Sequence, residues 1–521
     1  MVECHLPKVD VVGSSPIARS IFLFLLIVFH PTPSTAQVDP DPSRPFNQGQ
    51  VIVLPATSAY LGDLPHPILL EDGEESTHSL GGWLSSSAGW FPPGTGTPTG
   101  LRTLEPGLFF EGIAYPFESL PILRWIPMPQ SAGLLDFPAS AWWGREAAGG
   151  AVQINTPPLS SPATNDYLLW GGGGESFGAR DSLLADPGMA ELHFQGGPRT
   201  PESGSGRFEG LGKIRWFKDD DWKLESGLLA AQNTDDDNWY SFFTDLIWSG
   251  PNFQTIQFKP FFETAQLNGS QAQEWGGVLN YHFNLAGLAE SHLGFGYSRE
   301  NFSGLLPSVG REYAQAGFLG DVIGMLTLDS AFRLDFTNGS DGIFSYLVGL
   351  QGNQGDLTLL GDWDKGALGP GADVEQMDLG LRFQPNDSLT GTVQYIRQTV
   401  LGKNFNGGGW RSQWAAPRGL LIFQKAEARW EGRFLVDSLD QAVWDNSVKI
   451  TVSFFKWDSF WIKGRVLTGS PFYGEAGADF TVSKEFRIFV SADNVEDLPL
   501  SWPDPEMPLG RLFRAGIHGQ F

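Results

Sequence analysis

The sequence contains almost no cysteine: Cys4 is the only one in 521 residues. It precedes an apolar run, Ile21–Phe29, that follows Lys8 and Arg19 and leads to a small-residue cleavage site at residues 34–36. This pattern predicts a signal peptide over residues 1–36. Cys4 would leave with it, so the mature chain is expected to have no disulfide and no thiolate metal site.

A long hydrophobic run is also missing. Ile21–Phe29 is far shorter than the roughly 20 apolar residues that a helix needs to cross a bilayer, and no later segment comes closer. Any membrane residence is therefore expected to be through strands.

Positive charge is scarce. The chain has 34 Lys and Arg against 59 Asp and Glu, a formal net charge of −25. Residues 1–36 contain two of each sign, so removing them leaves this charge unchanged. Because nucleic acid binding relies on cationic side chains, nucleic acid is not an expected partner.

What the sequence does contain is alternation. In the last segment Phe513, Ala515 and Ile517 fall on one face, and Arg514, Gly516 and His518 on the other. A strand with one apolar and one polar face is typical of an outer-membrane barrel, which must be closed because lipid offers no hydrogen-bonding partner to a free edge. The composition, with 65 Gly, 19 Trp and 39 Phe, fits many strands with aromatic girdles.

The strands are expected to follow Pro157–Pro158, which divides residues 37–157 from residues 158–521. Alternation over residues 377–395 predicts one hairpin, with its turn at Pro385–Ser388. Further tight turns are predicted at 218–221, 285–288, 456–459 and 483–485. Residues 233–239 and 402–413 are interpreted as longer outward loops. The count of such segments from about residue 165 gives roughly twenty to twenty-two strands. A barrel of about 22 strands has a lumen wide enough to need a plug, which residues 37–157 would supply.

These features resemble the TonB-dependent outer-membrane receptor family. Phe137–Pro158 is similar to the end of that family's plug domain, Gly107–Phe117 to its strand leading into a turn, Gly171–Arg180 to its first barrel strand, and the segment from Phe489 to its closing hairpin. The resemblance implies an all-β membrane protein, an antiparallel barrel of about 22 strands with an N-terminal α+β plug in its lumen. The sequence departs from the family's pattern at residues 101–103 and 131–137, which indicates a divergent plug.

The resemblance also assigns residues to roles. The plug motif comprises Glu111, Gly112, Pro138, Ala139, Ser140, Trp143, Gly144, Gly149, Gly150 and Asn155. The residues for barrel closure and assembly are Asn494, Gly510, Arg511 and Phe521. We interpret the glycines of the motif as packing residues, since they remove side chains where the backbone turns or approaches the wall.

Family members contact TonB through a short segment near the mature N-terminus, by strand addition. The candidate here is Val51, Ile52, Val53, Leu54, Pro55 and Ala56. Pro55 removes one backbone donor, which would weaken edge pairing without preventing it. The same segment could instead be the first strand of the plug.

Three function classes remain open. The first is an importer of a metal chelate, vitamin or oligosaccharide, whose partners would be TonB with its energising complex, outer-membrane lipid, the barrel-assembly machinery and a small-molecule ligand. The second is an uncoupled plugged barrel that acts as a passive pore, surface-binding or structural protein. An enzyme comes last, because His282, His292 and His518 lie in alternating patterns with no nucleophile signature. Neither a cofactor nor a metal is expected, and the predicted location is the outer membrane of a Gram-negative bacterium.

Overall fold

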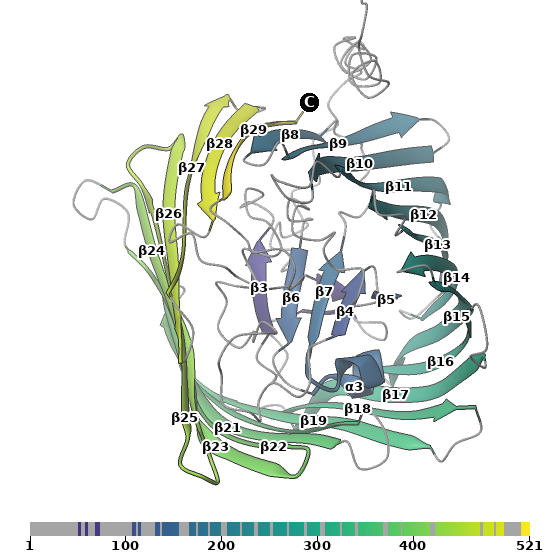
Figure 1. Ribbon diagram of the computed structural model, residues 1–521. Helices are drawn as coiled ribbons and strands as arrows, with labels where there is room; N and C mark the ends of the chain where they lie inside the picture. Colours follow the sequence, from purple (N-terminus) through teal and green to yellow (C-terminus); the bar gives the residue numbers. More distant parts are fainter. Residues whose placement is uncertain are drawn as a thin grey trace, which may run out of the picture. The chain divides into compact units, whose positions relative to one another are not determined.

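Antiparallel strands account for most of the fold of the computed structural model (Figure 1). Before the barrel, the structure describes residues 51–53, 58–60, 68–72, 107–110, 113–115, 131–135 and 138–155. In the barrel it describes residues 166–172, 176–185, 188–198, 206–218, 221–233, 238–250, 254–267, 270–285, 289–302, 308–323, 326–338, 342–367, 373–386, 388–416, 423–468, 472–483, 486–493 and 512–520. The predicted signal peptide lies outside these residues.

The 22 strands β8 to β29 of the described residues form one closed barrel in chain order. Their bounds are β8 Asp166–Gly172, β9 Ser176–Ala185, β10 Gly188–Pro198, β11 Gly206–Lys218, β12 Trp222–Asn233, β13 Asn238–Ser249, β14 Thr255–Leu267, β15 Ser270–Leu285, β16 Ala289–Phe302, β17 Val309–Ile323, β18 Leu326–Thr337, β19 Ile343–Gln354, β20 Leu357–Ala367, β21 Asp373–Asn386, β22 Leu389–Val400, β23 Lys403–Ala415, β24 Lys425–Asp437, β25 Ala442–Ser453, β26 Asp458–Leu467, β27 Tyr473–Ser483, β28 Phe486–Asp493 and β29 Leu512–Gln520.

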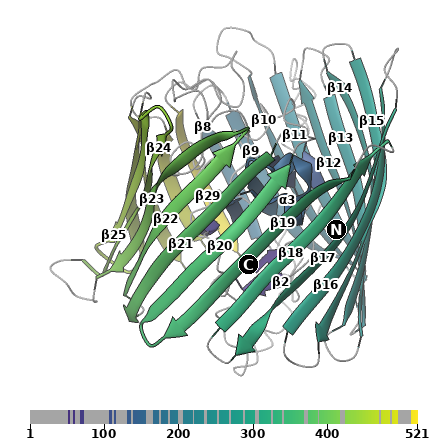
Figure 2. The same cartoon turned by 90° about the horizontal axis from the view of Figure 1, so that it is seen from below.

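Closure is made by β29 and β8, which pair antiparallel with Gln520 opposite Asp166. The strands run obliquely around the barrel, as Figure 2 shows, which is the tilt that closure of a sheet requires. We call the end where β8 starts and β29 ends the terminal end, and the opposite end the loop end. The prediction of an antiparallel barrel of about 22 strands is confirmed.

The outer face of the barrel is apolar. Leu359, Val393 and Ile462 are 63%, 61% and 58% exposed, although each is a large hydrophobic side chain. Exposed aromatic side chains lie toward both ends: Trp216, Trp222, Trp414 and Trp457 at the terminal end, and Tyr240, Trp275, Tyr297 and Trp444 toward the loop end. An apolar band between two aromatic girdles faces lipid, so the barrel is built to span a membrane.

A second, five-stranded sheet has the order β3-β6-β7-β4-β5. Its strands are β3 Ile68–Asp72, β4 Gly107–Phe110, β5 Ile113–Tyr115, β6 Ser131–Leu135 and β7 Ala151–Asn155, with helix α3 (Ser140–Trp143) and the 3-10 turn η4 (Arg145–Ala147) between β6 and β7. We call these elements together the N-terminal sheet. Two short strands, β1 Val51–Val53 and β2 Ser58–Tyr60, form a separate ladder.

The strand bounds test several of the sequence predictions. The turns predicted at 218–221, 285–288, 385–388, 456–459 and 483–485 all fall at or beside strand junctions. The interpretation of residues 402–413 as a loop is wrong, because they form most of β23, which pairs with β22 and β24 along its length. Only Leu401 and Gly402 connect β22 to β23, both with positive φ (48° and 79°). The first barrel strand is β8, so Gly171–Arg180 is the β8–β9 hairpin rather than that strand.

Candidate functional site: the inner wall and the N-terminal sheet

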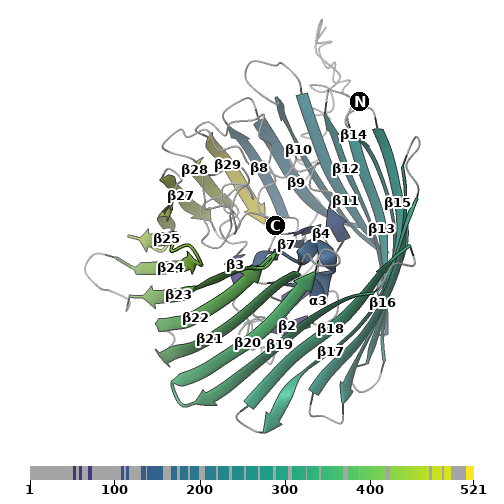
Figure 3. The same ribbon diagram turned by 60° about the horizontal axis from the view of Figure 1, so that its bottom comes forward.

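Helix α3 packs against the inner face of the barrel at β18, β19 and β20 (Figure 3). Ala331 of β18 and Leu347 of β19 are fully buried, whereas their outward neighbours Phe332 and Phe344 are exposed. Both inward residues belong to one apolar cluster with Trp142 and Trp143 of the helix. Since these two wall residues point into the lumen, α3 lies in the lumen.

The same cluster ties the helix to its own sheet. Phe109 of β4 packs on Trp143 with ring centroids 4.8 Å apart, and it is 2% exposed. The backbone reinforces this contact, because Gly107 N donates to Gly150 O at 3.0 Å. The N-terminal sheet is thus anchored to one sector of the wall through a short helix with two tryptophans.

A glycine in the wall makes room for this contact. A Cβ added to Gly366 of β20 would lie 2.8 Å from Ser140 Oγ and 2.9 Å from Ala148 Cα. Real Cβ atoms essentially never come that close, so any larger residue would push the helix away. Gly366 was not identified from the sequence, since its partner is more than 200 residues away in the chain and nothing local marks the contact.

The predicted plug motif is found largely in this docking region. Pro138, Ala139, Ser140 and Trp143 are buried in or beside α3, and Asn155 ends β7 opposite Ser131. Gly144 (φ 94°) and Gly150 (φ 110°) have positive φ, a backbone conformation that residues with a Cβ rarely adopt. Gly149 lies in the turn between them. Glu111 and Gly112 lie outside the described residues, between the paired Phe110 and Ile113.

The candidate TonB-contacting segment is described in part. Val51–Val53 forms β1 and pairs antiparallel with β2, with Val51 opposite Tyr60. Leu54, Pro55 and Ala56 lie outside the described residues. In this two-stranded ladder β1 has a second edge, which none of the described strands occupies. The segment is not part of the five-stranded sheet.

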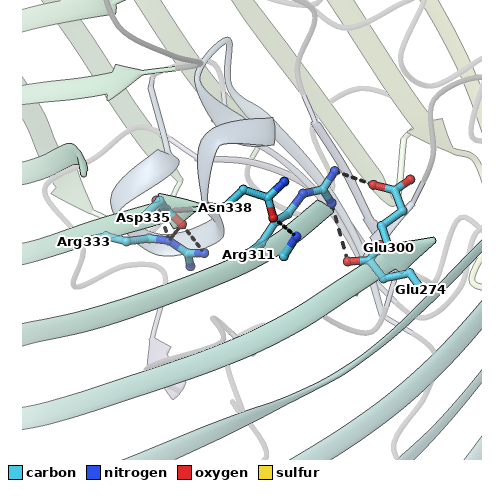
Figure 4. Close-up of polar contacts among 7 residues, drawn as sticks. Glu274, Glu300, Arg311, Arg333, Asp335 and Asn338 are labelled. Carbon is cyan, nitrogen blue, oxygen red and sulfur yellow. Dashed lines mark hydrogen bonds and ion pairs between the residues drawn. The ribbon is translucent and has the colours of Figure 1, made fainter. Parts of the chain in front are cut away.

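Toward the loop end, arginines on the inner wall bind carboxylates (Figure 4). Arg311 of β17 reaches Glu300 of β16 at 2.7 Å and Glu274 of β15 at 3.5 Å. Arg333 Nε donates to both carboxylate oxygens of Asp335, at 2.9 and 3.0 Å. The Arg311 contacts connect three neighbouring strands, and the Arg333–Asp335 pair lies within β18, all in the half of the wall that also holds α3. In each contact a guanidinium is paired with a carboxylate.

The turn above them is fixed by Asn338. Its Oδ1 accepts from Gly310 N at 2.6 Å, and its own backbone has a φ of 46°. Asparagine tolerates this left-handed conformation better than most residues. The residues assigned to barrel closure, Asn494, Gly510, Arg511 and Phe521, lie outside the described residues.

A polar pocket opens on the inner wall between β20 and β24, with about 660 Å³ of empty space that includes open solvent. Its charged lining consists of Asp362, Asp378, Arg382, Arg411, Glu431 and Arg433. Arg411 Nε lies 3.6 Å from Glu431 Oε2. Guanidinium and carboxylate groups side by side suit a polar solute with several hydrogen-bonding groups.

Above the pocket, the loop-end rim of the inner wall is apolar. Val374, Val400, Phe405, Leu435, Val443 and Leu467, from six consecutive strands, form a cluster with Ile396 in which every member is at most 4% exposed. Most connections at this end are short, as at Leu401–Gly402 and residues 268–269, but residues 494–511 make a longer one between β28 and β29. Apart from that connection, a ligand would meet few loop residues at the mouth.

No helix among the described residues is long and apolar enough to cross a membrane. Within the same residues, no group of three or more His, Cys, Asp or Glu side chains has the geometry of a metal site. His282 and His292 do face each other across β15 and β16, with ring centroids 6.1 Å apart.

Comparison with known proteins gives a result for the fold. The sequence matches no protein-family model, and no curated protein matches it. Among solved structures, the siderophore receptor PirA from Pseudomonas aeruginosa aligns with a TM-score of 0.70 at 13% identity, over 87% of this chain and 99% of that one. The chain has the fold of a siderophore receptor.

Other structures of this receptor fold agree. The ferric-catecholate import receptor Fiu from E. coli K12 aligns with a TM-score of 0.69 at 10% identity, over 91% of this chain and 99% of that chain. The siderophore receptor PiuA from Acinetobacter baumannii has a TM-score of 0.68 at 10% identity, over 89% and 98%. The receptor fold thus spans the N-terminal sheet as well as the barrel, while sequence identity is too low to carry residue roles across.

Proposed function

We propose that the protein is a TonB-dependent receptor of a Gram-negative outer membrane, which imports a scarce nutrient by rearranging its N-terminal sheet. The observation that carries this proposal is the docking of α3 onto the inner wall of a closed, lipid-facing barrel whose fold is that of siderophore receptors. In this role the N-terminal sheet is the plug. The protein is then a transporter and not an enzyme.

The strand directions give the orientation of the barrel in the membrane. In the resembled family the terminal aromatic residue lies at the periplasmic rim, so the terminal end would face the periplasm and the loop end the outside. Chain entry to the barrel is at the terminal end too, since β8 starts there. Residues 51–60, which precede the plug, would then have the periplasm within reach.

Coupling would use the hairpin of β1 and β2. A strand with an unoccupied edge can accept another strand through main-chain hydrogen bonds, which is the contact that TonB is expected to make. This supports residues 51–56 as the TonB contact over their reading as a strand of the plug sheet. Pulling on this hairpin would transmit force to β3 and the remainder of the sheet.

The cargo we propose first is a metal chelate, because the similar structures are named for siderophores and ferric catecholates. A vitamin or an oligosaccharide is the next class. The polar pocket between β20 and β24 is the candidate binding region, since it offers charged hydrogen-bonding groups inside the lumen. Lipid around the apolar band and the barrel-assembly machinery would be the remaining partners.

One observation favours a second candidate. Over β21–β26 the connections at the mouth, residues 401–402 and 438–441, are short and the inner rim is apolar and covered, so this sector offers little surface for capturing a ligand from outside. An uncoupled plugged barrel that acts as a passive pore, a surface-binding protein or a structural protein would have the same features.

Binding of the purified protein to the periplasmic domain of TonB separates the two candidates. We expect saturable binding to the full chain and none to a variant that lacks residues 51–60. A deletion strain grown on ferric chelates, cobalamin, haem and oligosaccharides then identifies the cargo. Absence of TonB binding, with growth unchanged on every nutrient, would favour the uncoupled barrel.

A further inference from the structure

Three cations lie in one row across neighbouring strands of the inner wall. Lys449 of β25 is directly opposite Arg429 of β24 on one side and Lys463 of β26 on the other. We call Arg429, Lys449 and Lys463 the basic row. Like charges directly opposite each other in a sheet are destabilising. The next residue in the row, Glu475 of β27, supplies one negative charge.

Two members of the basic row are also buried. Lys449 and Lys463 are 6% and 4% exposed, whereas Val448 and Ile450, which flank Lys449 in the sequence, are 41% and 44% exposed on the outer face. Alternation along the strand therefore directs both lysines into the lumen. The lumen of a barrel this wide has room for the chain that covers them.

Burial of ammonium groups requires anions. Placing an uncompensated charge out of water is costly, so buried lysines are paired in folded proteins. Lys449 and Lys463 do have polar or electrostatic partners within the chain. Glu475 offsets one of the three positive charges of the row, so we expect the chain that covers the row to be acidic.

The segment before the barrel has that character. Residues 49–157 contain ten Asp and Glu against three Arg and no Lys, a net charge of −7. Four of the ten acids fall within the five residues Glu71–Glu75 (EDGEE), the densest acidic run of the segment. Glu71 and Asp72 end β3, which pairs with β6 on one side and forms the edge of the N-terminal sheet on the other.

We propose that the basic row is a docking surface for the acidic segment Glu71–Glu75 of the same chain. This contact holds the edge of the N-terminal sheet that is furthest in strand order from β4, while α3 holds the side near β4 and β20. The sheet is then fixed to the wall at two points of different chemistry, one apolar and one ionic. Only the ionic point weakens with salt.

Charge reversal tests the contact in the full-length protein. Lys449→Glu with Lys463→Glu should raise the conductance of the purified protein in planar bilayers about tenfold or more, because like-charge contacts cost several kcal/mol and each 1.4 kcal/mol is tenfold. Adding Glu71→Lys and Asp72→Lys should return the conductance close to that of the wild type. The matched control, Lys403→Glu with Lys456→Glu, changes the charge equally at two exposed positions, the first residue of β23 and a turn, and should stay silent.

Crosslinking gives a second readout that does not depend on conductance or transport. In a Cys4→Ser background, Asp72→Cys with Lys463→Cys should be joined by a short bismaleimide, whereas Asp72→Cys with Lys403→Cys should not. Heat-modifiable migration on a gel verifies that each barrel has folded. The proposal is overturned if the first pair fails to crosslink in a folded barrel. It is also overturned if the variant with both lysines reversed conducts and the added reversals at Glu71 and Asp72 do not lower that conductance. That result would indicate that the basic row binds a soluble anion.

Discussion

Arg465 donates two parallel hydrogen bonds to Asp445 across β25 and β26, from Nε to Oδ1 at 2.8 Å and from Nη2 to Oδ2 at 2.9 Å. The two residues are 3% and 0% exposed. This pair lies beside the basic row and below the apolar rim, so it connects two strands in a part of the wall that water does not reach. Bidentate geometry orients this ion pair firmly.

Asp445→Ala is expected to destabilise the folded barrel by about 3 to 5 kcal/mol, because it leaves the Arg465 guanidinium buried without its main partner. The temperature at which the barrel loses its folded mobility on a gel should fall. Asp445→Leu combined with Arg465→Met should recover much of the loss. Lys425→Gln is the control, since the Lys425 side chain is 59% exposed in its pair with Glu427 and the pair should contribute less than about 1 kcal/mol.

Gly366→Val should displace α3 from the wall and open a leak. The added side chain would meet Ser140 Oγ and Ala148 Cα at distances shorter than van der Waals contact. Conductance in planar bilayers should rise while the barrel keeps its heat-modifiable migration. Gly391→Val serves as the control, because a Cβ at Gly391 meets no atom within 4 Å. Equal conductance of the two variants would contradict a tight contact between α3 and β20.

The architecture of the barrel could be predicted from the sequence, but the docking of the N-terminal sheet onto the wall could not. Strands such as β21 and β29 alternate so regularly that their faces are legible, because lipid on one side and the lumen on the other impose opposite demands on successive residues. The segment 402–413 was misread because its glycines and asparagines favour turns, whereas pairing on both edges holds them extended. Tertiary pairing overrides such local preferences.

The contacts of the N-terminal sheet are long-range and carry no periodic signal. Gly366 and Ser140 meet only because α3 docks at β20. The basic row depends on the register of β24, β25 and β26, and a one-residue slip would move each of its members to the outer face. A clue was nonetheless present in the sequence, since Lys449 stands between Val448 and Ile450 in a strand with an outward apolar face.

Gly144→Ala and Gly150→Ala should each weaken the docking of the N-terminal sheet by about 1 to 3 kcal/mol, because both positions have positive φ. Gly149→Ala is the matched control in the same turn. Limited proteolysis of the folded protein should cut before the barrel faster in the first two variants than in the third. Equal rates would show that backbone conformation at these positions does not limit the docking.

Removal of residues 49–157 should convert a silent protein into a conducting one. The lumen of a barrel of 22 strands is wide enough to pass water and small solutes unless something fills it. Planar bilayer recordings of the deletion variant provide the measurement, with folded migration as the control for assembly. A folded deletion variant that conducts no more than the full chain would contradict the role of these residues as a plug.

Val53→Pro tests the proposed coupling apart from ligand binding. If β1 is the TonB contact, its affinity comes mainly from main-chain hydrogen bonds, and a proline at Val53 removes one backbone donor from β1. Uptake of the identified cargo should be abolished, while binding of the same cargo to the purified receptor should be unchanged. Val51→Ala is the control, because it shortens a side chain and keeps the backbone donor. Uptake that persists in Val53→Pro, or that is the same in cells without TonB, would leave the uncoupled barrel as the better account of this protein.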